Sequence, residues 1–424
     1  MIDRTTAPRV IMPHFLDLVK AKLYRLDNGL TIYYYSGCSE PVLNLNIVLK
    51  AGKYYQQKDY EAFMTAALLK KGTKTQSALE IQEALDFHGA HLGISTNLFT
   101  SSLDLSCLSE KLIDVLPIVK DILLNASFPE EELKIAKHKH IQKLKLNQEK
   151  NEYVASVKFN EFIFGANHNC GKLTSEAMIS NIEKEDLVKY YHSRFLLSEQ
   201  STLILSGEIE ENTLQLINKI LGSIKLYDKE KIEVKPFISA SEKEYIISKP
   251  ESVQSSIRIG MPLSLTATDE EYLYFEILNR IFGGYFGSRL MKNIREDKGY
   301  TYGIYSFVSS FTKGSYFCIA TDVGKEYQED TLREISFEIN RLKNELISEE
   351  ELLMVKNYHK GRIMKSVDGS MRMANKLSTL LPLGLTEDHI NRQLEVVEKI
   401  TPEKIKALAI KYLDFENMYK IIVG

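Results

Sequence analysis

The order of predicted strands and helices runs twice along this chain, and that repetition restricts the fold more than any single motif does. Every second residue is apolar in Leu43–Leu49 near the start and again in Ile257–Met261 of the second half. A period of two with one polar face is typical of a half-buried strand in an antiparallel sheet. Each half also closes on a short apolar strand, Thr202–Ser206 and Tyr419–Val423. We therefore expect two units of the same plan.

Helix signals recur at matching places in the two halves. One helix is expected over 59–71, before Gly72, and its counterpart over 269–282, before Gly283. Long helices with acidic first turns, which the helix dipole favours, follow later in each half. Strands and helices in this order predict an α+β fold with two similar domains, each a mostly antiparallel sheet with helices packed on one face.

The chain is longer than one hydrophobic core supports. Its 424 residues exceed the roughly 250–300 at which single cores stop growing. The stretch 226–244 is rich in charge, contains Pro236 and shows no clean period. We predict an N-terminal domain over 1–225, a linker over 226–244 and a C-terminal domain over 245–424.

Charge and composition argue against several classes of function. The 54 Lys and Arg residues nearly balance the 57 Asp and Glu residues, which argues against nucleic acid as an obligate partner. No run of 18 apolar residues exists, so we expect no contact with a membrane. No basic and then apolar leader follows Met1, so we expect a cytoplasmic location, or a periplasmic one if a leader was removed. The four cysteines form no CxxC pair and do not predict a zinc site.

One stretch of the second half carries a family resemblance most specifically. It reads Leu278-Asn279-Arg280-Ile281-Phe282-Gly283-Gly284, then Ser288-Arg289-Leu290, then Arg295 through Tyr302. Together with Leu26-Asp27-Asn28-Gly29-Leu30 near the start, it resembles the insulinase, pitrilysin and mitochondrial processing peptidase family of zinc proteases. The resemblance spans nearly the whole chain and implies the two-domain fold.

The resemblance also implies a catalytic motif that this chain does not have. The family binds zinc through His-x-x-Glu-His on the first helix, where Glu is the general base, and through a second Glu on a later helix. Counting back from Lys71-Gly72-Thr73 places Phe63 and Ala67 at the two His positions and Ala66 at the catalytic Glu. Lys143 falls at the third-ligand position, with Leu144 next if the register slips by one. Because none of these side chains suits zinc, we expect no metal, no cofactor and no catalytic residue in this chain.

The remaining histidines do not restore the motif. His138 and His140 are two residues apart on a predicted helix, so they face apart, and we expect both on a solvated surface.

One functional pair of the family is retained. The resemblance implies that an Arg and a Tyr seven residues later contact the substrate backbone, and here they match Arg295 and Tyr302. A guanidinium and a phenol can donate hydrogen bonds to a substrate carbonyl and a developing oxyanion. The alternative is a structural salt bridge for Arg295 and an ordinary strand position for Tyr302.

This combination resembles the non-catalytic subunit of the family's bacterial heterodimers. We expect a subunit that is inactive alone, binds an extended peptide and donates Arg295 and Tyr302 to a partner that carries His-x-x-Glu-His and the zinc. A scaffold without a role in proteolysis, a homodimeric peptide-binding module, and a peptidase with an unrecognised metal site remain the alternatives.

Overall fold

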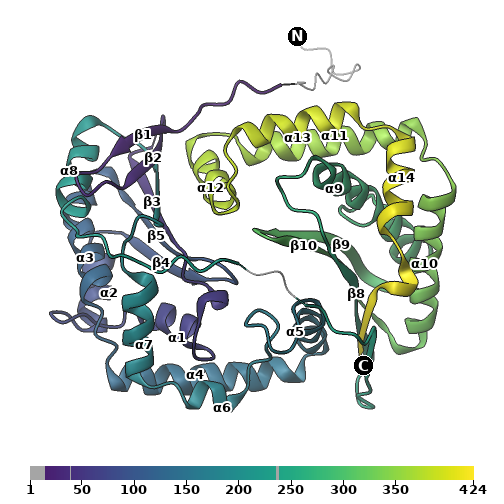
Figure 1. Cartoon of the computed structure of the whole chain (residues 1–424), viewed down its shortest axis with the longest axis horizontal. Coiled ribbons are helices and arrows are strands. Elements are labelled where there is room, and N and C mark those ends of the chain that lie inside the picture. The colour runs from purple at the N-terminus through teal and green to yellow at the C-terminus, as the bar shows by residue number, and fades with distance from the viewer. Residues whose placement is uncertain (1–14, 39, 235–237) are drawn as a thin grey trace, which may run out of the picture.

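The computed structural model describes residues 15–38, 40–234 and 238–424. The residues next to Met1, on which the expectation about a leader rests, and Pro236 of the predicted linker lie outside these ranges. In Figure 1 the first half, in purple to teal, lies beside the second half, in green to yellow, and each half has its own sheet. Among the described residues, no helix is both long and apolar enough to cross a bilayer.

The first sheet has six strands in the order β1-β2-β6-β3-β5-β4. They are β1 (Lys22–Arg25), β2 (Thr31–Ser36), β3 (Val42–Leu49), β4 (His91–Thr96), β5 (Ser101–Leu108) and β6 (Thr202–Gly207). All neighbours are antiparallel except β2 and β6, which are parallel. The register places Leu45 of β3 opposite Leu105 on one side and Leu205 on the other, and all three are buried. The alternating pattern therefore sets which face of β3 enters the core.

The second sheet repeats this topology with five strands in the order β7-β11-β8-β10-β9. They are β7 (Glu244–Ile247), β8 (Gln254–Leu263), β9 (Thr301–Phe311), β10 (Gly314–Gly324) and β11 (Tyr419–Val423). The one parallel pair again includes the last strand of the half: it is β11 with β7 here, as it is β6 with β2 in the first sheet. If β1 is left aside, the last strand of each half lies between the first two: β6 lies between β2 and β3, and β11 lies between β7 and β8. This shared order confirms the expected repetition.

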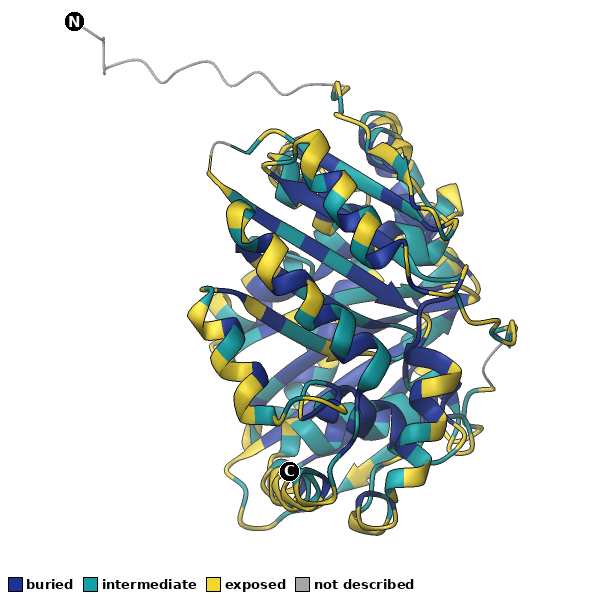
Figure 2. Ribbon diagram, turned by 90° about the vertical axis from the view of Figure 1, so that its left-hand side faces the viewer, coloured by how far each residue is buried: buried dark blue, intermediate teal, exposed yellow. Residues whose placement is uncertain are grey.

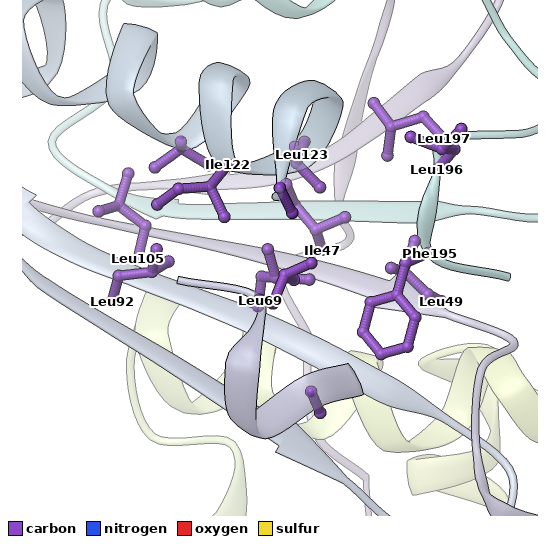
Figure 3. Packing of buried hydrophobic residues seen from close by; sticks show 14 of the residues in the cluster. Ile47, Leu49, Leu69, Leu92, Leu105, Ile122, Leu123, Phe195, Leu196 and Leu197 are labelled. Atoms are coloured by element: carbon purple, nitrogen blue, oxygen red, sulfur yellow. The ribbon is translucent and has the colours of Figure 1, made fainter. Parts of the chain in front are cut away.

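Helices pack on the two sheets or on one another and turn their apolar sides inward, as the dark and yellow stripes in Figure 2 show. They are α1 (Glu61–Leu68), α2 (Ala78–Phe87), α3 (Leu112–Asn125), α4 (Glu130–Glu149), α5 (Asn151–Phe164), α6 (Glu176–Ser180), α7 (Lys184–Tyr190), α8 (Glu211–Leu221), α9 (Glu270–Phe282), α10 (Gln328–Asn344), α11 (Glu349–Ser366), α12 (Ser370–Leu380), α13 (Asp388–Lys399) and α14 (Pro402–Tyr412). Figure 3 shows Ile122 and Leu123 of α3 beside Ile47 of β3 in the first core. The predicted α+β fold is confirmed.

The two halves also exchange one helix each, which the sequence did not indicate. Helix α5 of the first half packs on β8 and β11, where Phe159 and Phe162 join a core with Tyr419 and Ile421. Helix α12 of the second half packs on β2 and β6 in return, and its Leu377 shares a core with other residues of both halves. Each sheet therefore has its own helices on one face and a helix of the other half on its second face (Figure 1).

Candidate functional site

Arg295 lies on an irregular helical turn that fixes its backbone. Residues Met291–Asp297 form a π-helical turn, closed by the bond from the Lys298 amide to the Asn293 carbonyl at 3.0 Å. Asn293 is buried and its amide nitrogen donates to two carboxylates of α10, those of Glu334 and Glu338, at 2.9 Å each. π-Helical turns are rare and are often found at functional sites. The hydrogen bonds of Asn293 hold the backbone of this turn in place, and the Arg295 side chain on it is half-buried.

Tyr302 follows at the start of β9, at a bulge that turns it outward. The pairing with β10 shifts register between Thr321 and Val323, so that Tyr302 and Gly303 together oppose Asp322. Such a bulge redirects side chains and is frequent next to active sites. The Tyr302 side chain is 92% exposed.

The two predicted residues meet in space. The guanidinium carbon of Arg295 lies 5.4 Å from the centre of the Tyr302 ring and 4.6 Å from the ring of Phe286. Across the described ranges, the Arg295 guanidinium takes part in no hydrogen bond or ion pair, so its N–H donors are free for a ligand. The salt-bridge alternative for Arg295 is therefore not what the structure has. Sequence reasoning missed Phe286, although an aromatic residue set among glycines is a usable signal.

The positions of the lost zinc motif lie on α1 and α4, which pack against each other. Phe63 and Ala67 are half-buried on α1, and Ala66 is buried. On α4, Lys143 is exposed whereas Leu144 is buried in the first core. No hydrogen bond, ion pair or ring contact within the described residues joins this set to Arg295 or Tyr302.

A tyrosine and a histidine fill the space beside these positions. Tyr60 precedes α1 in the left-handed conformation, at φ 73°, and its ring lies 5.8 Å from that of Phe63. The Tyr60 hydroxyl lies 2.8 Å from Nδ1 of His140 on α4. Burial raises the pKa of Tyr60 to about 12. The pKa of His140 is lowered, mainly by burial and to a smaller extent by the positive charge of Lys143. The expectation that His140 lies on a solvated surface was wrong, because α4 turns this side chain toward α1.

Zinc does not fit this arrangement. Phenyl and methyl side chains supply no lone pair, and an ammonium repels a dication. The described residues contain no group of three or more His, Cys, Asp or Glu side chains placed to hold a metal.

A pocket of about 560 Å³ lies between the two halves. Its wall combines polar residues of β3, the β4–β5 turn, the end of β9, the turn after β9 and α12, among them Asn46, Asn97, Ser310, Thr312 and Ser378. Hydroxyl and amide groups of this kind can hydrogen-bond to peptide backbone.

Models of known protein families and several known relatives match the sequence of this chain. A model of the insulinase family, peptidase family M16, matches residues 36–168, and a model named peptidase M16 inactive domain matches residues 181–358. A relative in Bacillus subtilis (strain 168), named uncharacterized zinc protease YmxG, is 25% identical over 400 residues, which cover 92% of this chain and 94% of the relative. A Helicobacter pylori relative named non-peptidase homolog YmxG is 25% identical over 266 residues, 60% of this chain and 59% of its own length.

A solved structure shares the whole fold. The crystal structure of a peptidase M16 inactive domain from Pseudomonas fluorescens superposes with a TM-score of 0.86 at 20% identity, covering 96% of this chain and 98% of that one. The two family models together match most of the chain, and the residue types of the zinc motif are absent from their expected positions. The chain therefore belongs to the insulinase family, peptidase family M16.

Proposed function

We propose that this chain is the non-catalytic subunit of a two-subunit zinc peptidase that acts on unfolded peptides. In this role it binds an extended peptide and donates Arg295 and Tyr302 to the zinc site of its partner. The observation that carries the proposal is the convergence of these two side chains on one exposed site, with the N–H donors of Arg295 free.

The chemistry of the pair suits carbonyl polarisation. Arg295 supplies several N–H donors in one plane, and the Tyr302 hydroxyl supplies one more. Donors aimed at a developing oxyanion stabilise the transition state of amide hydrolysis, and a charge-assisted hydrogen bond contributes about 1.5–3 kcal/mol. The motif positions of this chain hold no residue type that would activate water, so in this role the zinc and the general base come from the partner.

Two further features support peptide binding. The pocket between the halves presents hydroxyl and amide groups that can bind a peptide backbone, beside the charged residues Lys50, Glu233 and Lys313. Strand β4 ends the first sheet next to α1, and an extended peptide can add to such an edge. One edge acceptor is already used, because Lys70 Nζ donates to the Leu92 carbonyl at 2.7 Å.

The partner is a family subunit that carries His-x-x-Glu-His, in a heterodimer, and zinc is bound by that subunit alone. We propose a cytoplasmic location for the pair. Neither nucleic acid nor a membrane takes part in this function.

The test is a peptidase assay on the complex reconstituted with the His-x-x-Glu-His subunit of the same host. We expect Arg295→Ala and Tyr302→Phe each to lower kcat/KM by about ten- to a hundred-fold, as loss of a charge-assisted hydrogen bond implies. Tyr305→Phe on the same strand and Arg372→Ala on α12 are matched controls, since both side chains are partly exposed and lie outside the site.

Two results would count against the proposal. Full activity of both site variants would exclude the donor role. A stable complex without peptidase activity would favour the scaffold instead.

A further inference from the structure

The third member of the exposed site, Phe286, is held in place more firmly than an ordinary surface residue. It lies in a turn closed by the bond from the Ser288 amide to the Tyr285 carbonyl at 3.2 Å. The Phe286 ring is 62% exposed, and its face is 4.6 Å from the Arg295 guanidinium.

Both ends of this turn are fixed. Before it, an Arg280 nitrogen donates to the Gly284 carbonyl at 2.6 Å. After it, Arg289 makes a two-pronged pair with Glu351, at 2.9 and 2.8 Å. The backbone that carries Phe286 is therefore anchored on both sides, and its ring lies against the Arg295 guanidinium.

The residue before Phe286 turns the other way. The Tyr285 ring packs against Tyr358 of α11, with the ring centres 4.7 Å apart and the planes tilted by 34°, and it also covers Gly287, where a Cβ would lie 2.8 Å from the ring. A Cβ at 287 would therefore displace the Tyr285 ring, and the turn separates an inward ring from an outward one.

The geometry at Arg295 follows from these constraints. Its guanidinium lies over the faces of two exposed rings, and within the described residues its N–H groups donate no hydrogen bond. A guanidinium attracted to ring faces keeps its N–H donors available, because cation–π contacts use the faces of the ring and leave hydrogen bonds in the plane unmade. A carbonyl bound at these donors would also lie next to the exposed apolar surface of Phe286 and Tyr302.

We propose that Phe286 is a positioning residue that holds Arg295 with its donors outward, and that this surface selects peptides with a large apolar side chain beside the bound carbonyl. The inference rests on the proposed function and deepens it by naming the substrate class. Removal of the ring leaves Arg295 free to rotate, so peptide affinity and the preference for an apolar residue fall together.

The experiment measures binding of the full chain to two labelled unfolded peptides that differ only in one central residue, leucine or serine. Fluorescence anisotropy reports affinity. We expect Phe286→Leu to bind the leucine peptide about two- to five-fold more weakly, in line with the size of an exposed cation–π contact, and to lose preference over the serine peptide. Phe286→Tyr keeps the ring and should behave as the wild type.

A matched control exists elsewhere on the same half. Phe337 is 53% exposed and lies 5.7 Å from the Arg341 guanidinium, so Phe337→Leu removes an equivalent pair outside the site and should leave binding unchanged. A second readout is independent of peptide. In protein labelled with 15N-arginine, the Arg295 Nε–H resonance should change its chemical shift in Phe286→Leu, which removes one of the two rings, and keep it in Phe286→Tyr.

The outcomes separate the two proposals. If Arg295→Ala weakens binding but Phe286→Leu changes neither affinity, preference nor the Arg295 resonance, the inference is wrong and the proposed function stands. If Arg295→Ala and Tyr302→Phe both leave affinity unchanged, the proposed peptide site is itself wrong.

Discussion

Replacing Phe159 by alanine tests whether the helix exchange between the two halves stabilises the fold. Phe159 is 3% exposed on α5, and its ring lies 5.9 Å from that of Tyr316 on β10. It also reaches Gly260 on β8, where a Cβ would be 2.8 Å from the ring. The mutation is therefore in the first half of the chain, whereas the contacts it removes are in the second sheet.

The size of the effect follows from burial. Deleting a fully buried phenylalanine ring costs about 3–5 kcal/mol, from lost transfer free energy and the cavity left behind. We expect the free energy of unfolding in urea to fall by that amount. Hydrogen exchange measured by mass spectrometry should then accelerate in β8, β10 and β11, although these strands lie about a hundred residues or more further along the chain.

The control is Ile135→Ala on α4, the preceding helix, where the side chain is 59% exposed. A surface change of this kind should alter stability by less than about 0.5 kcal/mol. The reasoning is refuted if Phe159→Ala costs no more than Ile135→Ala, or if the faster exchange is confined to strands of the first sheet.

Four other outcomes are expected. Gly260→Ala should prevent accumulation of soluble protein, because a Cβ there would lie 2.0 Å from a neighbouring backbone oxygen, whereas Gly303→Ala, with no atom within 4 Å, should be harmless by thermal melting. Tyr35→Phe should cost about 1–3 kcal/mol, since it removes the buried 2.6 Å hydrogen bond to Glu387 that joins the halves; limited proteolysis should show earlier cleavage near the N-terminal segment. Burial lowers the pKa of His359 to about 3, so the native state binds fewer protons than the unfolded state below pH 6.5, and stability should fall with decreasing pH by up to about 1.4 kcal/mol per pH unit more than in His359→Gln. The purified chain, dialysed against zinc and analysed by mass spectrometry of metals, should retain far less than one zinc per chain; a stoichiometric value would overturn the assignment of the lost ligands.

Local patterns in the sequence were sufficient for the repeated architecture. Alternation predicted the buried face of β3, and helix stop signals at Gly72 and Gly283 predicted the ends of α1 and α9 to within a few residues. These properties depend on neighbours within a few positions along the chain, and sterics and burial act on them directly. That Arg295 and Tyr302 lie close together could also be predicted from the sequence, because only seven residues separate them and a family motif contains both.

The sequence by itself determined that the chain repeats one α+β plan and that zinc-binding side chains are absent from the motif positions. Only the tertiary structure decided which sheet receives α5, that His140 turns toward Tyr60, and that Phe286 contacts Arg295. The apolar side of α5 specifies that the helix must be buried but not against which strand, because either sheet would satisfy the hydrophobic effect. That choice depends on where the rest of the chain places its surfaces, and contacts between residues a hundred positions apart leave no periodic trace in one sequence.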